Sequence, residues 1–462
     1  MKQPHHTINK TKLALCAGAA ALAALAPQTH AQSNDALIDK LEAKGILTAD
    51  EAKDLRAESD KDFKAAMQAK TGTPDWVTSY KIYGDFRGRY DQENATDNST
   101  AIDRLRWRYR LRFGITANII DNMEVGFRLA TDDNASGGGS STSQGSPLSG
   151  NETFQNNATK KQIWVDTAYA KWTAINSGDW LMAATIGKME NPFSFTPMVF
   201  DADYTPEGAA LTTAYNINDQ HSVTVTGGAF VLDEESTTTQ DPYLYGGQVV
   251  LNSKWTKKWS TSIGGGGFQI SNPQQLTAGN VPFQNQGNTY NAAGVLVNHY
   301  NPIIGDASVT YKMESFPFYP GECPIKVGGE ILDNTAVNNN NMGYWVGAAL
   351  GKVGGKGTWD LSYRYEWLEA DAWYCQLVDD DNAAFYQNPA AGGLASRGYY
   401  GGTNVKGHLV KFNYAVTDYL MVSLTGYLTE LINANNQQTG GLFAAEPNST
   451  AVHFMADLTW KF

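Results

Sequence analysis

A strict alternation of arginine and large apolar residues over Arg104–Phe113 is the feature that most restricts the fold of this chain. Successive side chains of a strand point to opposite faces, so the arginines share one face and the apolar residues the other. A soluble sandwich would have to bury the apolar face while a continuous cationic stripe faced water. A membrane barrel instead places the apolar face in lipid and the arginines in a water-filled lumen. The alternation therefore favours a strand of a transmembrane β-barrel.

Residues 1–31 have the pattern of a secretory signal peptide. Lys2, Lys10 and Lys12 form a positive start, Leu13–Ala26 is apolar, and Thr29–Ala31 is a small-x-small cleavage site. A short anchoring helix is the alternative, but the apolar run is shorter than the roughly 18 residues that span a bilayer. We expect export across the inner membrane and a mature chain that begins at Gln32.

Charge and cysteine content exclude several classes of protein. The chain has 35 Lys and Arg against 47 Asp and Glu, a net charge of −12, so nucleic acid is not an expected partner. Only Cys323 and Cys375 follow the signal peptide, too few for a disulfide framework. We expect them not to pair, because one falls near a periplasmic turn and the other in an outer loop, whereas bridged Cα atoms lie within about 7 Å.

Residues 32–75 differ from the rest and predict a helical periplasmic segment with a linker. Asn34–Leu41 is typical of a capped helix that ends at Gly45, and Thr48–Glu51 is a capping box that begins a second helix. The apolar stripe is too narrow for a core of its own. The segment therefore pairs with copies of itself or lies against another surface such as the cell wall; a plain amphipathic spacer is the alternative.

From Tyr80 onward the pattern has period two, and short turns alternate with long polar loops, as in outer-membrane barrels. We predict an all-β antiparallel barrel of about sixteen strands over residues 76–462, because single-chain bacterial barrels have an even number. Parity also places the strand-like residues 291–302 in a loop. The predicted strands are 80–91, 104–116, 123–132, 162–172, 179–189, 208–217, 222–232, 243–252, 259–270, 304–314, 324–333, 343–353, 358–369, 407–416, 419–430 and 451–462.

The last predicted strand ends on an aromatic residue and alternates throughout. Leu458, Trp460 and Phe462 lie on its apolar face. The pattern resembles the C-terminal signal by which the barrel-assembly machinery recognises outer-membrane barrels. We expect these three residues to serve as that insertion signal.

Catalysis finds little support in the sequence. Four histidines of the barrel region fall in different predicted elements, and no Gly-x-Ser-x-Gly, His-Glu-x-x-His or phosphate-loop motif occurs. We expect no enzyme activity and no cofactor. The glycine run Gly264–Gly267 lies inside a predicted strand and is interpreted as a bulge or a close approach at a subunit contact.

Several short motifs resemble a porin family related to the phosphate-selective porins O and P. They include Gly84–Tyr90 in the first predicted strand, Gly187–Phe193, and Asp201–Gly208. In that family the last two segments enter a loop that narrows the channel. The resemblance extends over nearly the whole mature chain and implies a sixteen-stranded, trimeric, water-filled channel, without identifying a solute.

Charged residues of three consecutive strands and one loop are the candidate site. A pore selects through its size and the fixed charges that line it. The predicted cationic wall consists of Arg87, Arg89, Arg104, Arg106, Arg108, Arg110, Arg112 and Arg128. The acidic residues of the predicted constriction loop are Asp201, Asp203 and Glu207. Facing the wall, they would create a transverse field; alternatively the loop faces outward, and the arginines pair with acidic groups and only hold the inner wall together.

A second acidic group is Asp379–Asp381 together with Asp371. Its oxygens can hold a hard cation such as calcium, but a solvated acidic loop is the favoured interpretation, so we predict no metal site.

The function predicted from the sequence is an outer-membrane porin for passive diffusion of small hydrophilic solutes. An anion- or phosphate-selective channel is the nearest alternative, and a structural barrel that tethers the outer membrane to the cell wall is another. The expected surroundings are outer-membrane lipid and lipopolysaccharide, and the expected assembly is a homotrimer.

Overall fold

The computed structural model describes residues 38–59, 72, 74–96, 101–133, 145–277, 281–282, 286–291, 293–382, 401–433 and 450–462. The chain forms two compact units, residues 1–77 and 78–462. The predicted signal peptide, 1–31, lies outside the described residues.

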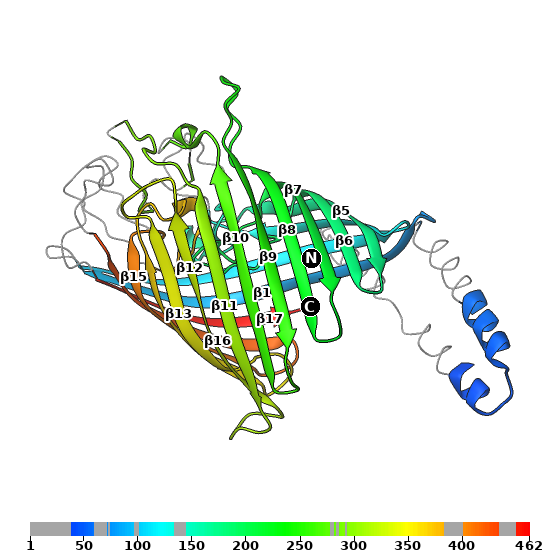
Figure 1. Ribbon diagram of the computed structural model, residues 1–462. Helices are drawn as coiled ribbons and strands as arrows, with labels where there is room; N and C mark the ends of the chain where they lie inside the picture. The colour runs from blue at the N-terminus through cyan, green and yellow to red at the C-terminus, as the bar shows by residue number, and fades with distance from the viewer. Residues whose placement is uncertain are drawn as a thin grey trace, which may run out of the picture. The chain divides into compact units, whose positions relative to one another are not determined.

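Within the described residues of the second unit, sixteen long antiparallel strands form one closed sheet (Figure 1). A two-residue strand, β4, pairs only with β2. The strands are β1 (Val77–Thr96), β2 (Ala101–Ile119), β3 (Met123–Thr131), β4 (Glu152–Thr153), β5 (Ile163–Ser177), β6 (Trp180–Lys188), β7 (Glu207–Asn216), β8 (His221–Val231), β9 (Tyr243–Lys254), β10 (Trp259–Ile270), β11 (Pro302–Met313), β12 (Cys323–Asn334), β13 (Met342–Gly351), β14 (Trp359–Leu368), β15 (Val405–Ala415), β16 (Leu420–Leu431) and β17 (Thr450–Lys461). Short 3₁₀ turns are η1 (Asn156–Ala158), η2 (Pro273–Gln275) and η3 (Cys375–Leu377).

The last strand closes the barrel on the first. β17 pairs with β1 from Asp85↔Lys461 to Thr96↔Thr450, and Gly84 and Phe462 exchange backbone hydrogen bonds of 3.0 and 3.1 Å. A closed sheet leaves no unpaired strand edge, which is the condition for a sheet to exist in lipid. The chain therefore satisfies the backbone requirement of a membrane barrel.

The sixteen predicted strands all appear, with ends that differ by a few residues. The ends of β1 and of β5 each extend five residues beyond the predicted strands, to Thr96 and Ser177. Since β2 begins at Ala101, the connection between β1 and β2 is shorter than the predicted strands implied. The described residues of 291–301 form no strand; Leu296 makes only an isolated bridge with Tyr290. The prediction that this segment lies in a loop is confirmed. Cys323 and Cys375 are both free, as predicted.

The outer surface of the barrel is apolar and the inner surface is charged. In β2 the side chains of Leu105 and Trp107 are 64% and 62% exposed, and Phe113 is also exposed, whereas Arg110 is buried. In β17 Leu458 and Trp460 are exposed and His453 is buried. The period-two pattern thus predicted which residues face outward, because most strands pair without a change of register; β5 is the exception, with irregularities in its pairing with β3 and β6.

Three long loops at one end of the barrel meet inside it and form an apolar core with inward side chains of β8–β12 and β14. These are the β6–β7 loop (189–206), the β10–β11 loop (271–301) and the β14–β15 loop (369–404). Phe193 of the first loop lies 4.9 Å, centroid to centroid, from Phe268 of β10, and Trp373 of the third donates to the carbonyl of Val199 at 2.8 Å. The core lies opposite β1–β3, since the sheet runs in sequence order around the barrel. The loops therefore fill the side of the lumen away from the arginines.

The prediction of a bulge at Gly264–Gly267 was wrong. β10 pairs with β9 and β11 without a register shift through all four glycines. A side chain at Gly264 would meet the carboxylate of Asp306 at 2.0 Å, and one at Gly266 would meet the Phe195 ring at 3.0 Å. Gly264 and Gly266 thus permit a close approach to neighbouring groups of the same chain, and the subunit contact stays a prediction.

The first unit contains helical residues 38–43 and 49–59. The capping box forms as predicted: Thr48 N–H donates to Glu51 Oε2 at 2.8 Å, and Glu51 N–H donates to Thr48 Oγ1 at 3.3 Å. Arg56 joins the helices through Asp39 and Glu42, at 2.6 and 2.9 Å. Neither described helix is long and apolar enough to cross a membrane.

Gly246→Ala tests the packing of the inner core. An added Cβ would lie 2.0 Å from the Phe268 ring and 2.6 Å from the carbonyl of Gly267, so we expect the free energy of unfolding in detergent micelles to fall by about 1–3 kcal/mol. Gly426→Ala in β16 is the matched control, because no atom lies within 4 Å of its added Cβ. Equal stability of the two variants would contradict this account of the core.

Candidate functional site

The arginines of β2 are paired with carboxylates of β1. Arg106 contacts Asp91 at 3.1 Å and also forms an ion pair with Glu93, and Arg108 contacts Asp91 at 3.4 Å. Arg104, the most exposed of the series, is 3.9 Å from Glu93. The pairing follows from the sequence, because alternation places the acidic residues of β1 on the same inner face as the arginines.

Arg110 and Arg112 join the wall to the β6–β7 loop. Asp85 of β1 accepts from Arg110 at 2.9 Å and from Arg112 at 2.7 Å. Asp203 of the loop lies 3.0 and 3.5 Å from the same two guanidinium groups. Burial alone would raise the pKa of Asp203, but Arg110, Arg87 and Arg112 hold it below its usual value. The loop therefore presents an ionised carboxylate to the wall.

Two other predicted arginines are paired elsewhere on the wall. Arg89 makes a two-pronged contact with Asp457 of β17, at 2.8 and 3.0 Å, and lies 3.4 Å from Asp381 of the β14–β15 loop. Arg128 of β3 pairs with Asp166 of β5 and Glu190 of the β6–β7 loop. Most contacts of the predicted arginines are therefore ion pairs with acidic side chains, as in the alternative interpretation in which the arginines hold the inner wall together.

Arg87 is the exception among the eight arginines. It has no ion-pair partner among the described residues, and its one hydrogen bond runs from Nη2 to Asn151 Oδ1 at 2.6 Å. Its Nε is buried without a hydrogen-bond partner. Arg89 and Arg110 on either side are both neutralised, so Arg87 carries the uncompensated charge of this part of the wall.

Three carboxylates from two loops form an acidic cluster that sequence reasoning did not find. Oxygens of Asp201, Asp379 and Asp380 lie within 4.8 Å of one another. Burial and the neighbouring carboxylates raise the pKa of Asp201 and Asp380 well above the usual range, and burial raises the pKa of Asp379 to about 6 although Arg364 opposes this. Two backbone hydrogen bonds hold the β6–β7 loop against the β14–β15 loop. Asp201 N–H donates to the carbonyl of Leu377 at 2.7 Å, and Asp379 N–H donates to the carbonyl of Pro197 at 2.9 Å.

Two predicted acidic residues lie elsewhere. Glu207 is the first residue of β7, exposed, and paired with Lys188 of β6 at 3.0 Å, so it does not face the arginines. Asp371 accepts from Thr289 N–H and Oγ1 at 3.0 and 2.6 Å and is not part of the acidic cluster. Glu207 is thus not in the predicted position, and the solvated acidic loop that the sequence favoured is wrong, because Asp371 and Asp379 are both buried.

A cavity of about 920 Å³ remains between the arginines and the packed loops. Its lining includes five of the eight predicted arginines, namely Arg87, Arg89, Arg110, Arg112 and Arg128, together with Asp201 and Asp203. Arg104, Arg106 and Arg108 do not line this cavity. Basic residues of distant strands also reach it: Lys326 of β12, Arg364 of β14 and Lys411 of β15. The alternation of side chains along a strand would have identified these three as inward-facing, because each comes directly after an apolar residue that is expected to face outward.

Asp85→Asn tests whether the paired charges hold the wall together. The change leaves Arg110 and Arg112 with Asp203 as their remaining described carboxylate, so we expect the free energy of unfolding to fall by about 1–3 kcal/mol, toward the lower value where water screens the pair. Glu314→Gln is the control, because it breaks an exposed ion pair with Lys258 at the barrel end. The measurement is denaturant unfolding in micelles; a loss no larger than that of the control would contradict the structural role.

Comparisons with known proteins give one family match and several distant structural similarities. No curated protein matches the chain. Among solved structures, Pseudomonas putida OprB at high pH has a TM-score of 0.47 and 11% identity, over 83% of this chain and 94% of that one. Salmonella typhi OmpF in complex with daunomycin has a TM-score of 0.43 and 10% identity, over 83% and 97%. OmpT of Vibrio cholerae has a TM-score of 0.40 and 11% identity, over 84% and 99%.

Because these TM-scores are below 0.5, the structural similarities carry no argument about function. Residues 94–292, somewhat less than half of the chain, match a family model described as "Putative porin". That segment includes β2, the β6–β7 loop and most of the inner core. The match supports a porin family for this chain.

Proposed function

We propose that the chain is an outer-membrane porin through which small hydrophilic solutes diffuse passively, without catalysis or a cofactor. The observation that carries the proposal is the cavity of about 920 Å³ inside a closed barrel, lined by charged side chains of both signs, under an apolar outer surface. Water-filled barrels in outer membranes combine these two surfaces. The absence of recognisable catalytic motifs in the sequence agrees with a channel.

The proposed mechanism is electrostatic filtering at the β6–β7 loop, which serves as the constriction. Asp203 faces Arg110 and Arg112 across a few ångströms, and Asp201, Asp379 and Asp380 lie beyond it. Such a separation of charge produces a field across the cavity in which a polar solute aligns its dipole. An apolar solute has no dipole that the field can align, so the constriction favours polar solutes.

An anion preference is the second candidate, and the charge of the lining favours it. Ten basic and seven acidic side chains line the cavity. Arg87, Lys326, Lys411 and Lys461 have no ion pair with a described carboxylate, whereas the acidic residues nearest the wall are neutralised by arginines. Free cationic groups raise the local concentration of anions without a tight site.

Planar-bilayer recording tests the proposal directly. Purified protein that produces stepwise, ohmic conductance supports a channel, and protein that inserts but gives no open conductance would defeat it. The homotrimer, the interaction with lipopolysaccharide and the contact of the helical segment with the cell wall remain proposals, and cross-linking of purified outer membranes would examine the first.

Arg87→Gln should lower the ratio of anion to cation permeability by roughly sevenfold, since over several ångströms of water a unit charge attracts an anion and repels a cation by about 0.6 kcal/mol each. The readout is the reversal potential in a salt gradient. Lys258→Gln removes the same charge from an exposed turn and should leave the ratio unchanged. If both variants kept the wild-type ratio, Arg87 would have no part in selectivity.

Selectivity should also depend on pH. The pKa of Asp379 is about 6, so acidification through this value removes a negative charge from the lining and leaves Arg364, its partner at 3.3 Å, with Glu366 at 3.0 Å as its remaining described carboxylate. We expect the reversal potential to shift toward anions as the pH falls through about 6. Asp379→Asn should have the shifted value at neutral pH already and should vary less; a wild-type pH profile in this variant would contradict the assignment.

A further inference from the structure

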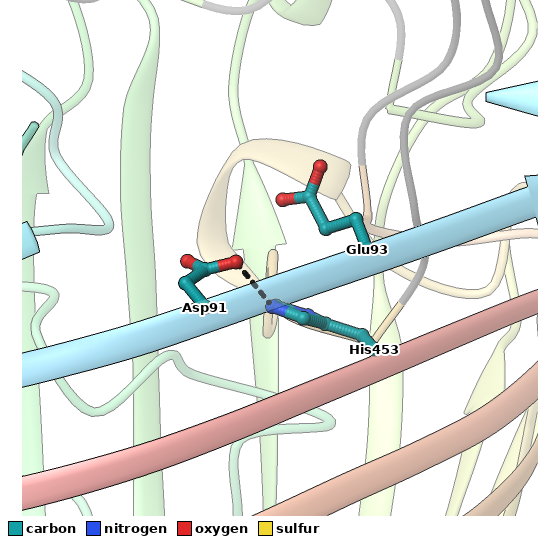
Figure 2. A group of neighbouring side chains, drawn as sticks. All are labelled: Asp91, Glu93 and His453. Carbon is teal, nitrogen blue, oxygen red and sulfur yellow. Dashed lines mark hydrogen bonds and ion pairs between the residues drawn. The ribbon is translucent and has the colours of Figure 1, made fainter. Parts of the chain in front are cut away.

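His453 of β17 lies where the barrel wall meets the β14–β15 loop. Its side chain is 2% exposed and points inward, next to Asp91 and Glu93 of β1 (Figure 2). The ring stacks on Tyr427 of β16 with the centroids 6.0 Å apart. The imidazole thus contacts two neighbouring strands and, through Asp381, the loop that contributes the acidic cluster.

Both ring nitrogens of His453 face hydrogen-bond acceptors. Nε2 is 3.2 Å from Asp91 Oδ1, and Nδ1 is 2.8 Å from the backbone carbonyl oxygen of Asp381. A neutral imidazole carries one N–H and would direct a lone pair at the second oxygen. An imidazolium donates to both, so the geometry requires the doubly protonated ring.

The charges around the ring require the same form. Two separate sets of ion pairs flank the ring: three carboxylates with three arginines around Asp91, and two carboxylates with one arginine around Arg89. Together they contain five carboxylates and four guanidinium groups, so one further positive charge between the sets balances the sum. The members are Asp91, Glu93, Asp133, Asp381, Asp457, Arg89, Arg104, Arg106 and Arg108. Tyr427, whose hydroxyl donates to Asp379 Oδ2 at 3.0 Å, is the remaining titratable group that faces the ring.

A metal ion is the competing explanation, because ligand atoms of Asp91, Glu93 and His453 lie within 4.8 Å of one another. Arg106 already contacts both carboxylates and Arg108 contacts one of them. A divalent cation would have to displace these guanidinium groups or lie beside them. A protonated His453 satisfies the same acceptors without displacing either arginine.

We propose that His453, as an imidazolium, is a positioning residue that ties the β14–β15 loop to the barrel wall and so fixes the acidic residues at the constriction. On deprotonation the ring keeps one N–H and loses one of its two contacts. Asp91 retains Arg106 and Arg108, whereas the carbonyl of Asp381 has His453 as its one described donor. The loop therefore loses one of its contacts with the barrel wall, while Arg89 still contacts Asp381 at 3.4 Å, and the constriction becomes more mobile in alkaline solution. This inference rests on the proposed channel function.

Single-channel recording of the full-length protein at mildly acidic and at alkaline pH tests the proposal. For the wild type we expect open-channel current fluctuations to become about tenfold more frequent in alkaline solution, the factor that a hydrogen bond to a charged group contributes to an equilibrium. His453→Phe keeps a stacked ring without donors and should fluctuate at the higher rate at both pH values. His453→Arg keeps the charge and should remain quiet at both.

His408→Phe is the control, because His408 is an exposed histidine of β15 whose contacts are with Tyr363 and Tyr365. It should retain the wild-type profile. The inference fails if His453→Phe retains that profile too. It also fails if ¹⁵N spectra of the histidine-labelled wild type show a neutral His453 ring in mildly acidic micelles, and this measurement needs no folded variant. Wild-type protein that never conducts would instead contradict the channel function itself. The ¹⁵N spectra would then still show whether the His453 ring is doubly protonated.

Discussion

Closure of the sheet is the constraint on which the rest of the structure depends. In lipid every backbone N–H and C=O must find a partner within the protein, so a strand such as β2, with an apolar outer face, requires neighbours on both sides. The pairing of β17 with β1 satisfies that requirement for the whole sheet. Once the sheet is closed, alternation sends half of the side chains inward, and the chain must then neutralise or hydrate a densely charged interior.

Ion pairs between neighbouring strands neutralise most of the charged side chains inside the barrel. Asp85 and Asp91 of β1 lie beside the arginines of β2, and the loops provide Asp203, Glu190 and Asp381 for the arginines that remain. Each guanidinium that a carboxylate neutralises becomes a fixed dipole and no longer a free charge. Arg87 has no such partner among the described residues. It is therefore the arginine that we propose to act most strongly on passing ions, although the sequence gives it no distinction from the other seven.

The barrel was predictable from the sequence, whereas the inner arrangement was only partly so. Period-two alternation depends on local geometry, so the strands and their outward faces could be derived residue by residue. Their even number came instead from the general rule for single-chain barrels, which placed residues 291–302 in a loop. The paths of long loops depend on contacts between distant segments. Nothing local indicates that Asp201 meets Asp379, that Glu207 pairs with Lys188, or that Phe193 packs on Phe268. Lys326 and Lys411 were accessible to the same parity argument as the arginines and were overlooked because they stand alone in their strands.

The apolar core inside the barrel gives these charges their positions. Three loops pack against β8–β12 and exclude water from that side of the lumen, so the remaining cavity lies along the charged strands opposite. An acidic loop in open water would sample many positions and produce no steady field. Held by Trp373 on Val199, by Asp379 N–H on Pro197 and by His453 on Asp381, the loop carboxylates stay within a few ångströms of the wall. The hydrophobic packing on one side of the barrel therefore fixes the positions of the charges on which the proposed electrostatic filter depends.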